Sequence, residues 1–211
     1  MNIRKWFFLF WSTMAIGAVV TTIVGSLMQW TDRSFGFIGV EAAGFNAGMM
    51  ALVGLLFGAF SQMGFFSYLT LNYIALSVLR KGYLWNALQA YTVLFALGGL
   101  GYLLYQDRAT LNNDWIFWVL PLGLAVAAYG VAYYKAKLTN NNAFIPTLFL
   151  QVVVTVIESW KALQGEGANL NAMFFMIVPM FACNAYQILL LHRLVRKTQT
   201  ADSASNAKPA V

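Results

Sequence analysis

The chain has 211 residues, of which 60% are hydrophobic and only 9% are Asp, Glu, Lys or Arg, and its formal net charge is +6. Soluble domains carry about 25% charged residues, so this sequence cannot supply the charged surface that a water-soluble protein of its size needs. The composition predicts one membrane domain. The basic residues are scattered over several loops, which is not the pattern of a nucleic-acid binder. The single cysteine, Cys183, excludes an internal disulfide.

The first predicted span, about 6–28, follows Arg4-Lys5. Its apolar run is longer than a signal-peptide core, and no A-x-A-like cleavage site closes it, so we expect the span to be retained.

The next segment, from Glu41 to Arg80, contains no charged residue between its two ends. As one helix it would be about 57 Å long, whereas a bilayer core is about 30 Å thick. We therefore assign 44–62 to the span itself. The continuation to 79 is either the same helix extended or a helix that lies along the inner membrane surface.

Four further apolar runs complete an all-α, polytopic integral membrane protein with six transmembrane helices. The tail after Lys197 is rich in Ser, Ala and Asn and is expected to be disordered in the cytoplasm. The predicted organisation is a six-span domain over 1–197, with spans at about 6–28, 44–62, 85–105, 115–134, 146–163 and 170–191, and a disordered tail over 198–211.

The distribution of charge predicts the orientation, because Lys and Arg in short loops favour the cytoplasmic side. With both termini inside, one side of the membrane holds ten of the 13 basic residues: Arg4, Lys5, Arg80, Lys81, Lys135, Lys137, Arg193, Arg196, Lys197 and Lys208. The outer side holds Arg33, Arg108 and Lys161. Most acidic residues, Glu158 and Glu166 among them, fall outside. We predict a multi-pass protein of the bacterial cell membrane whose basic loops face anionic lipid.

An enzyme is disfavoured because titratable groups are scarce. The one histidine, His192, stands beside Arg193 at the end of the last span, and no His, Asp or Glu cluster has metal-ligand spacing. Glu158 and Lys161 are three residues apart and are interpreted as a surface pair at the outer interface. We predict no catalytic, cofactor-binding or metal-binding residues.

A small transporter or channel component for a neutral solute is the alternative. Transport pathways usually contain ionisable residues inside the spans, whereas the predicted span interiors here hold only amides and hydroxyls, such as Gln62, Gln151 and Asn184. These groups more often join helix to helix.

One run carries a specific resemblance: Ser61-Gln62-Met63-Gly64-Phe65-Phe66-Ser67-Tyr68-Leu69-Thr70. It resembles a segment of the KbaA family, multi-span proteins of spore-forming Bacillales that are named for activating the KinB sensor-kinase pathway to sporulation. Supporting stretches are Arg4-Lys5-Trp6-Phe7, Leu84-Trp85-Asn86, Asn184-Ala185-Tyr186-Gln187 and Leu191-His192-Arg193-Leu194.

The resemblance implies a non-catalytic membrane regulator whose partner is a membrane sensor histidine kinase of the KinB type. Membrane lipid is its other partner, and neither nucleic acid nor metal is expected. Small residues three or four apart let helices approach closely inside lipid, so lateral helix contacts are the expected mechanism. The candidate contact residues are Gly44, Gly48, Gly54, Gly58, Ser61, Gln62, Gly64, Phe65, Tyr68, Arg80 and Lys81.

Overall fold

The computed structural model describes residues 3–31, 42–107, 115–163 and 170–206. Within this description, the side chains of Lys161 and of 192–206 are left out. The predicted outer-loop residues Arg33, Arg108 and Glu166 lie outside the described ranges, and so does 207–211.

All regular structure in the described ranges is helical. The elements are α1 (Ile3–Thr31), α2 (Ala43–Leu79), α3 (Gly82–Gln106), α4 (Ile116–Leu138), the 3₁₀ turn η2 (Asn141–Ala143), α5 (Phe144–Phe149), the π-helical segment η3 (Leu150–Val154), α6 (Thr155–Glu158), α7 (Trp160–Leu163) and α8 (Leu170–Asn206).

Within the described residues, six helical runs are long and apolar enough to cross a membrane, which confirms the predicted all-helical fold with six apolar helices. They are α1 to α4, the broken run Asn141–Glu158, and Leu170–Leu191 of α8. Large apolar side chains such as Ile23, Leu52 and Val126 are more than half exposed on the outside of the bundle. An exposed apolar surface of this kind suits lipid rather than water.

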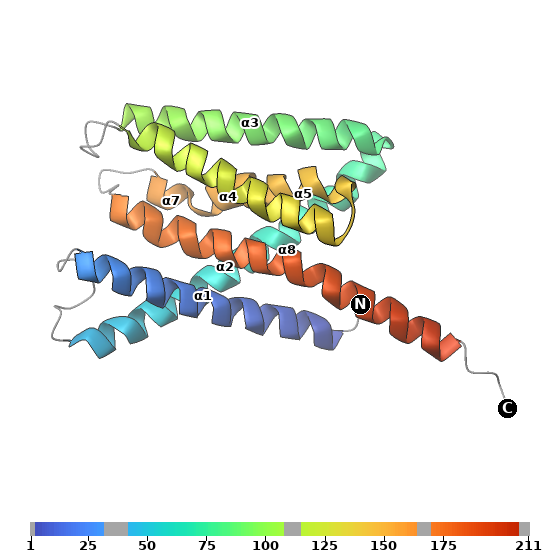
Figure 1. Ribbon diagram of the computed structural model, residues 1–211, viewed down its shortest axis with the longest axis horizontal. Helices are drawn as coiled ribbons and strands as arrows, with labels where there is room; N and C mark the ends of the chain where they lie inside the picture. Colours follow the sequence, from blue (N-terminus) through green and yellow to red (C-terminus); the bar gives the residue numbers. More distant parts are fainter. Residues whose placement is uncertain (1–2, 32–41, 108–114, 164–169, 207–211) are drawn as a thin grey trace.

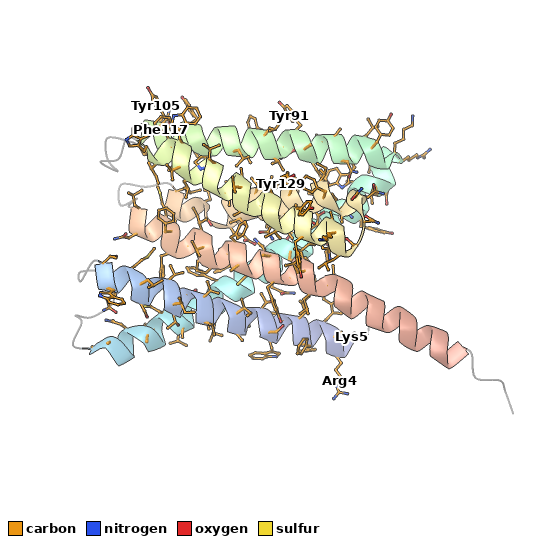
Figure 2. All side chains as sticks on the ribbon, in the orientation of Figure 1. Arg4, Lys5, Tyr91, Tyr105, Phe117 and Tyr129 are labelled. Carbon is orange, nitrogen blue, oxygen red and sulfur yellow. The ribbon has the colours of Figure 1, made fainter. Side chains whose placement is uncertain are left out.

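The six runs alternate in direction (Figure 1). α1 begins and α8 ends at the same end of the bundle, and the α2–α3 and α4–η2 turns lie there too. We call this the basic end, because Arg4, Lys5, Arg80, Lys81 and Lys137 belong to the elements that meet there. Figure 2 shows Arg4 projecting away from the bundle at this end. The opposite end is marked by aromatic packing between α3 and α4, where the rings of Tyr105 and Phe117 lie 5.3 Å apart (Figure 2).

Glycines set the closest helix contact, between α1 and α2. Gly17 faces Gly54 and Gly58, and a Cβ added at Gly58 would lie 2.6 Å from the Cα of Met14. The two backbones therefore touch where larger residues would hold them apart, as small residues allow in membrane bundles. α8 packs against the same pair, so α1, α2 and α8 form one group, while α3, α4 and α5 form a second.

α2 is one continuous helix of 37 residues. The predicted continuation to Leu79 thus extends the span itself, and in Figure 1 it crosses behind the other helices from one end of the bundle to the other. A tight turn at Arg80-Lys81 follows, in which Arg80 takes the left-handed conformation with φ 53°. The indole N–H of Trp85 donates to the Asn72 side-chain oxygen at 2.7 Å, which fixes the angle between α2 and α3.

One element differs from expectation. The fifth span is broken into η2, α5, η3, α6 and α7, where a single helix was predicted. α8 continues to Asn206, and the disorder predicted for the tail over 198–211 stays a prediction.

Candidate functional site: a buried polar cluster

Polar side chains from three elements meet inside the bundle. Ser61 comes from α2, Thr155 and Glu158 from α6, and Asn184 and Gln187 from α8. Ser61, Thr155, Asn184 and Gln187 are fully buried. We call these five residues the polar cluster. It joins α2 and α8 of the first helix group to the broken fifth span.

Asn184 is the hub of the polar cluster. Its amide nitrogen donates to Glu158 Oε2 at 2.8 Å and to Thr155 Oγ1 at 3.1 Å. Its amide oxygen accepts from the Ser61 hydroxyl at 2.9 Å. Gln187 in turn donates to Ser61 Oγ at 2.7 Å. Both amide hydrogens of Asn184 are therefore used.

Two oxygens of the polar cluster have no hydrogen-bond partner among the described residues. They are Glu158 Oε1 and Gln187 Oε1, and both atoms are buried. The hydroxyl of Ser159, next along the chain, is also buried and unpaired. Buried polar groups normally find partners, so the cluster has spare capacity to accept hydrogen bonds.

The backbone of the fifth span explains how Glu158 reaches this position. An unbroken β-branched run over 152–157 lowers helix propensity, and here α5 passes into the wider η3 before α6 begins. Such π-helical segments are frequent at functional sites. α6 then ends at Glu158. On α2, Gly64 lies against Glu158 and Val154, and a Cβ at this glycine would overlap the free carboxylate oxygen.

Other buried polar groups lie around the polar cluster. Gln62 and Gln151 are buried, and neither amide has a hydrogen-bond partner among protein groups. Toward the basic end, the ammonium group of Lys135 is buried and donates to the backbone oxygen of Ile188 in α8 at 2.6 Å. Lys135 therefore ties α4 to α8.

The structure divides the predicted contact residues into three sets. Gly54 and Gly58 lie against α1. Ser61, Gln62, Phe65 and Tyr68 are buried, and Gly64 lies beside Glu158. The residues that stay exposed are Gly44, Gly48, Arg80 and Lys81.

Two sequence interpretations need correction. Glu158 is not a surface residue paired at the outer interface, because its carboxylate is bonded to Asn184 inside the bundle. Lys135 was expected in a cytoplasmic turn, but α4 extends to Leu138 and carries it into the helix contact. The sequence signal for Glu158 was its position directly after an apolar run that starts at Pro146.

The site offers hydrogen bonding rather than multi-group catalysis. Among the described residues, no three His, Cys, Asp or Glu side chains are grouped as a metal site would require. The side chain of His192 lies outside the description. A carboxylate surrounded by amides and hydroxyls can hold a cation, a proton or water.

Fold and site together define the class: an α-helical protein whose described part has six helices long and apolar enough to span a membrane, with a buried polar cluster at a helix junction. A family model described as KbaA, KinB-signalling pathway activation in sporulation, matches residues 17–194. The chain is also 34% identical over 192 residues to the KinB-signaling pathway activation protein of Bacillus subtilis (strain 168), with 89% of this chain and 96% of that protein covered. The chain belongs to the KbaA family, which confirms the resemblance seen in the run 61–70. No solved structure matches it significantly.

Proposed function

We propose that this protein is a membrane activator of a KinB-type signalling pathway at the start of sporulation, and that it acts through contact rather than catalysis. The observation that carries the proposal is the family match over 17–194, which takes in the polar cluster and five complete helical runs. The description of the family names a signalling role and no reaction.

The location follows from the apolar surface and the charge. The protein lies in the cell membrane with the basic end toward the cytoplasm, so that both termini are inside. The exposed apolar side chains on the bundle surface and the positive charge of one end support this orientation.

The proposed partner is a membrane sensor histidine kinase of the KinB type, bound laterally in the bilayer. The residues available for this contact are the exposed members of the predicted set, Gly44 and Gly48 near the start of α2 and Arg80-Lys81 at its end. A contact that favours the active kinase by about 2 kcal/mol would shift its population about thirtyfold.

Deletion of the gene in its spore-forming host tests the function. Spore yield should fall, and a phosphorelay activated downstream of the kinase should restore it. If downstream activation does not restore sporulation, the protein acts elsewhere and the proposal fails.

A cross-linking experiment tests the contact. A photoreactive amino acid at Gly48 or Lys81 should capture the kinase in intact membranes, whereas one at Val126, an exposed position of α4, should not. Equal capture from all three positions would indicate chance collision. Substitution of Gly54 or Gly58 cannot test the contact cleanly, because both glycines pack against α1.

Transport of a small polar solute is the second candidate. Its support is the broken fifth span beside the polar cluster, since interrupted helices in transporters often line binding sites. Purified protein in sealed vesicles should take up the solute if this candidate is right. Neutral solutes that fail to enter faster than in empty vesicles would exclude it.

A further inference from the structure

We propose that the polar cluster is a binding site for a small monovalent cation, held by the Glu158 carboxylate and the side-chain oxygen of Gln187. The inference stands apart from the signalling role, because it concerns the isolated protein and needs no kinase.

The first argument is the hydrogen-bond inventory of the polar cluster. The Ser61 hydroxyl and both amide hydrogens of Asn184 are committed to neighbours. The two unpaired atoms, Glu158 Oε1 and Gln187 Oε1, are both acceptors. Gln187 is itself fully buried and its amide nitrogen already lies in the cluster. Two unpaired acceptors can bind a cation, a proton or a donor such as water, and not another acceptor.

The second argument is charge. An ionised carboxylate inside an apolar bundle is costly unless a cation neutralises it. Among the described residues, Gly64 of α2 and Asn184 of α8 lie against Glu158. The ionisable neighbour among the described side chains, which do not include that of Lys161, is the Cys183 thiol of α8, which can only add negative charge and donates weakly to the Thr13 carbonyl of α1. Among the described side chains, no Lys or Arg pairs with this carboxylate.

The donor set decides which cation fits. Calcium takes six to eight oxygen ligands, often with several carboxylates, whereas the polar cluster offers a single carboxylate. A proton needs only the carboxylate, and a sodium ion can use its free oxygen together with the Gln187 oxygen and hydroxyl groups nearby. Sodium is therefore the cation that the two unpaired oxygens fit, and the experiment separates sodium binding from protonation of the carboxylate alone.

Carbodiimide labelling tests the proposal. A hydrophobic carbodiimide such as dicyclohexylcarbodiimide adds to protonated carboxyl groups buried in membrane proteins. Purified protein in micelles is labelled across a pH series at constant ionic strength, in sodium or in choline, and the adduct at Glu158 is measured by mass spectrometry. The Glu158→Gln variant gives the background, and Asp107→Asn removes a carboxyl at the end of α3, outside the polar cluster, as a matched control.

The outcomes are distinct. If sodium binds, it slows Glu158 labelling relative to choline, about tenfold when its concentration is about ten times its Kd, and Gln187→Leu weakens this protection. Labelling that rises as the pH falls but is the same in sodium and choline shows only the protonation that any carboxyl undergoes, and it overturns the proposal.

Thermal unfolding provides a second measurement that does not depend on reagent access. The midpoint of the wild-type protein should rise with added sodium relative to an equal concentration of choline, whereas Glu158→Gln should show a smaller rise and Asp107→Asn the full one. If Glu158→Gln and the wild type respond identically to sodium, the polar cluster binds no sodium.

Discussion

Asn184 does more than any other residue of the polar cluster to join the elements around it. Its side chain bonds to α2 through Ser61 and to α6 through Thr155 and Glu158. In water each of these groups could bond to solvent, but inside a bilayer the alternative partners are few. A single amide thus sets the position of the fifth span relative to both of its neighbours.

Replacement of Asn184 by Ala should destabilise the bundle by about 2 kcal/mol, because three interhelical hydrogen bonds of about 0.6 kcal/mol each are lost. Reversible unfolding in mixed micelles measures this loss. Thr92→Ala is the matched control, because the Thr92 hydroxyl bonds only to the Leu88 carbonyl of its own helix. Equal stability of the Asn184 variant and the control would show that the hub contributes nothing.

The sequence predicted that amides and hydroxyls join the helices, but it did not predict that Glu158 belongs to the polar cluster. The amides and hydroxyls inside the spans were predicted as helix-joining groups, and Asn184 and Gln187 act in this way. Glu158 was missed because a carboxylate at the end of an apolar run usually marks an interface. Its true position depends on a break in the fifth span and on the space that Gly64 leaves on another helix. Neither feature can be deduced from the residues around Glu158.

At the scale of the elements, the long uncharged stretch of α2 serves two purposes. Gly54 and Gly58 of α2 pack against the backbone of α1. A Cβ added at Gly44 or Gly48 would meet no atom within contact distance. The spacing of the small residues predicted close helix packing, and the structure places that packing between α1 and α2. The sequence could not say which glycines are used, because all four belong to similar small-residue patterns. The position of Gly17 on α1 decides it.

Alanine at Gly54 and at Gly48 should have opposite effects on stability. A Cβ at Gly54 would lie 2.6 Å from the Cα of Ala18, so the helices must separate, at a typical cost of about 1–3 kcal/mol. At Gly48 the space is open, and alanine should gain up to about 1 kcal/mol from its higher helix propensity. The unfolding midpoint in detergent should therefore fall for Gly54→Ala and stay equal or rise for Gly48→Ala. The α1–α2 contact is unimportant if both midpoints move alike.

At the scale of the whole molecule, the distribution of basic residues and the direction of the helices support the same arrangement, with the basic turns at one end of the bundle. The sequence predicted six apolar helices, and the part of the chain that the structure describes contains six. The arrangement also accounts for α2, because its 37 residues form one helix that connects opposite ends of the bundle (Figure 1). Had the stretch formed two crossings, every later turn would exchange sides. The turn at Arg80-Lys81 and the turn after Lys137 would then both lie at the end opposite the basic end, whereas both are found at the basic end.

The two ends of α3 provide a direct test of the orientation in the membrane. In a Cys183→Ser background, one variant carries Gly82→Cys beside the basic turn and the other carries Gln106→Cys at the far end of the same helix. A maleimide that cannot cross membranes should label the Gln106 position in intact cells, and should label the Gly82 position only after the membrane is opened. The two sites share one helix, so expression and insertion are matched. Labelling of the Gly82 position from outside would place the basic end outside the cell. It would also remove the cytoplasmic surface through which Arg80-Lys81 is proposed to meet the kinase, because lysines and arginines of short loops are retained on the cytoplasmic side.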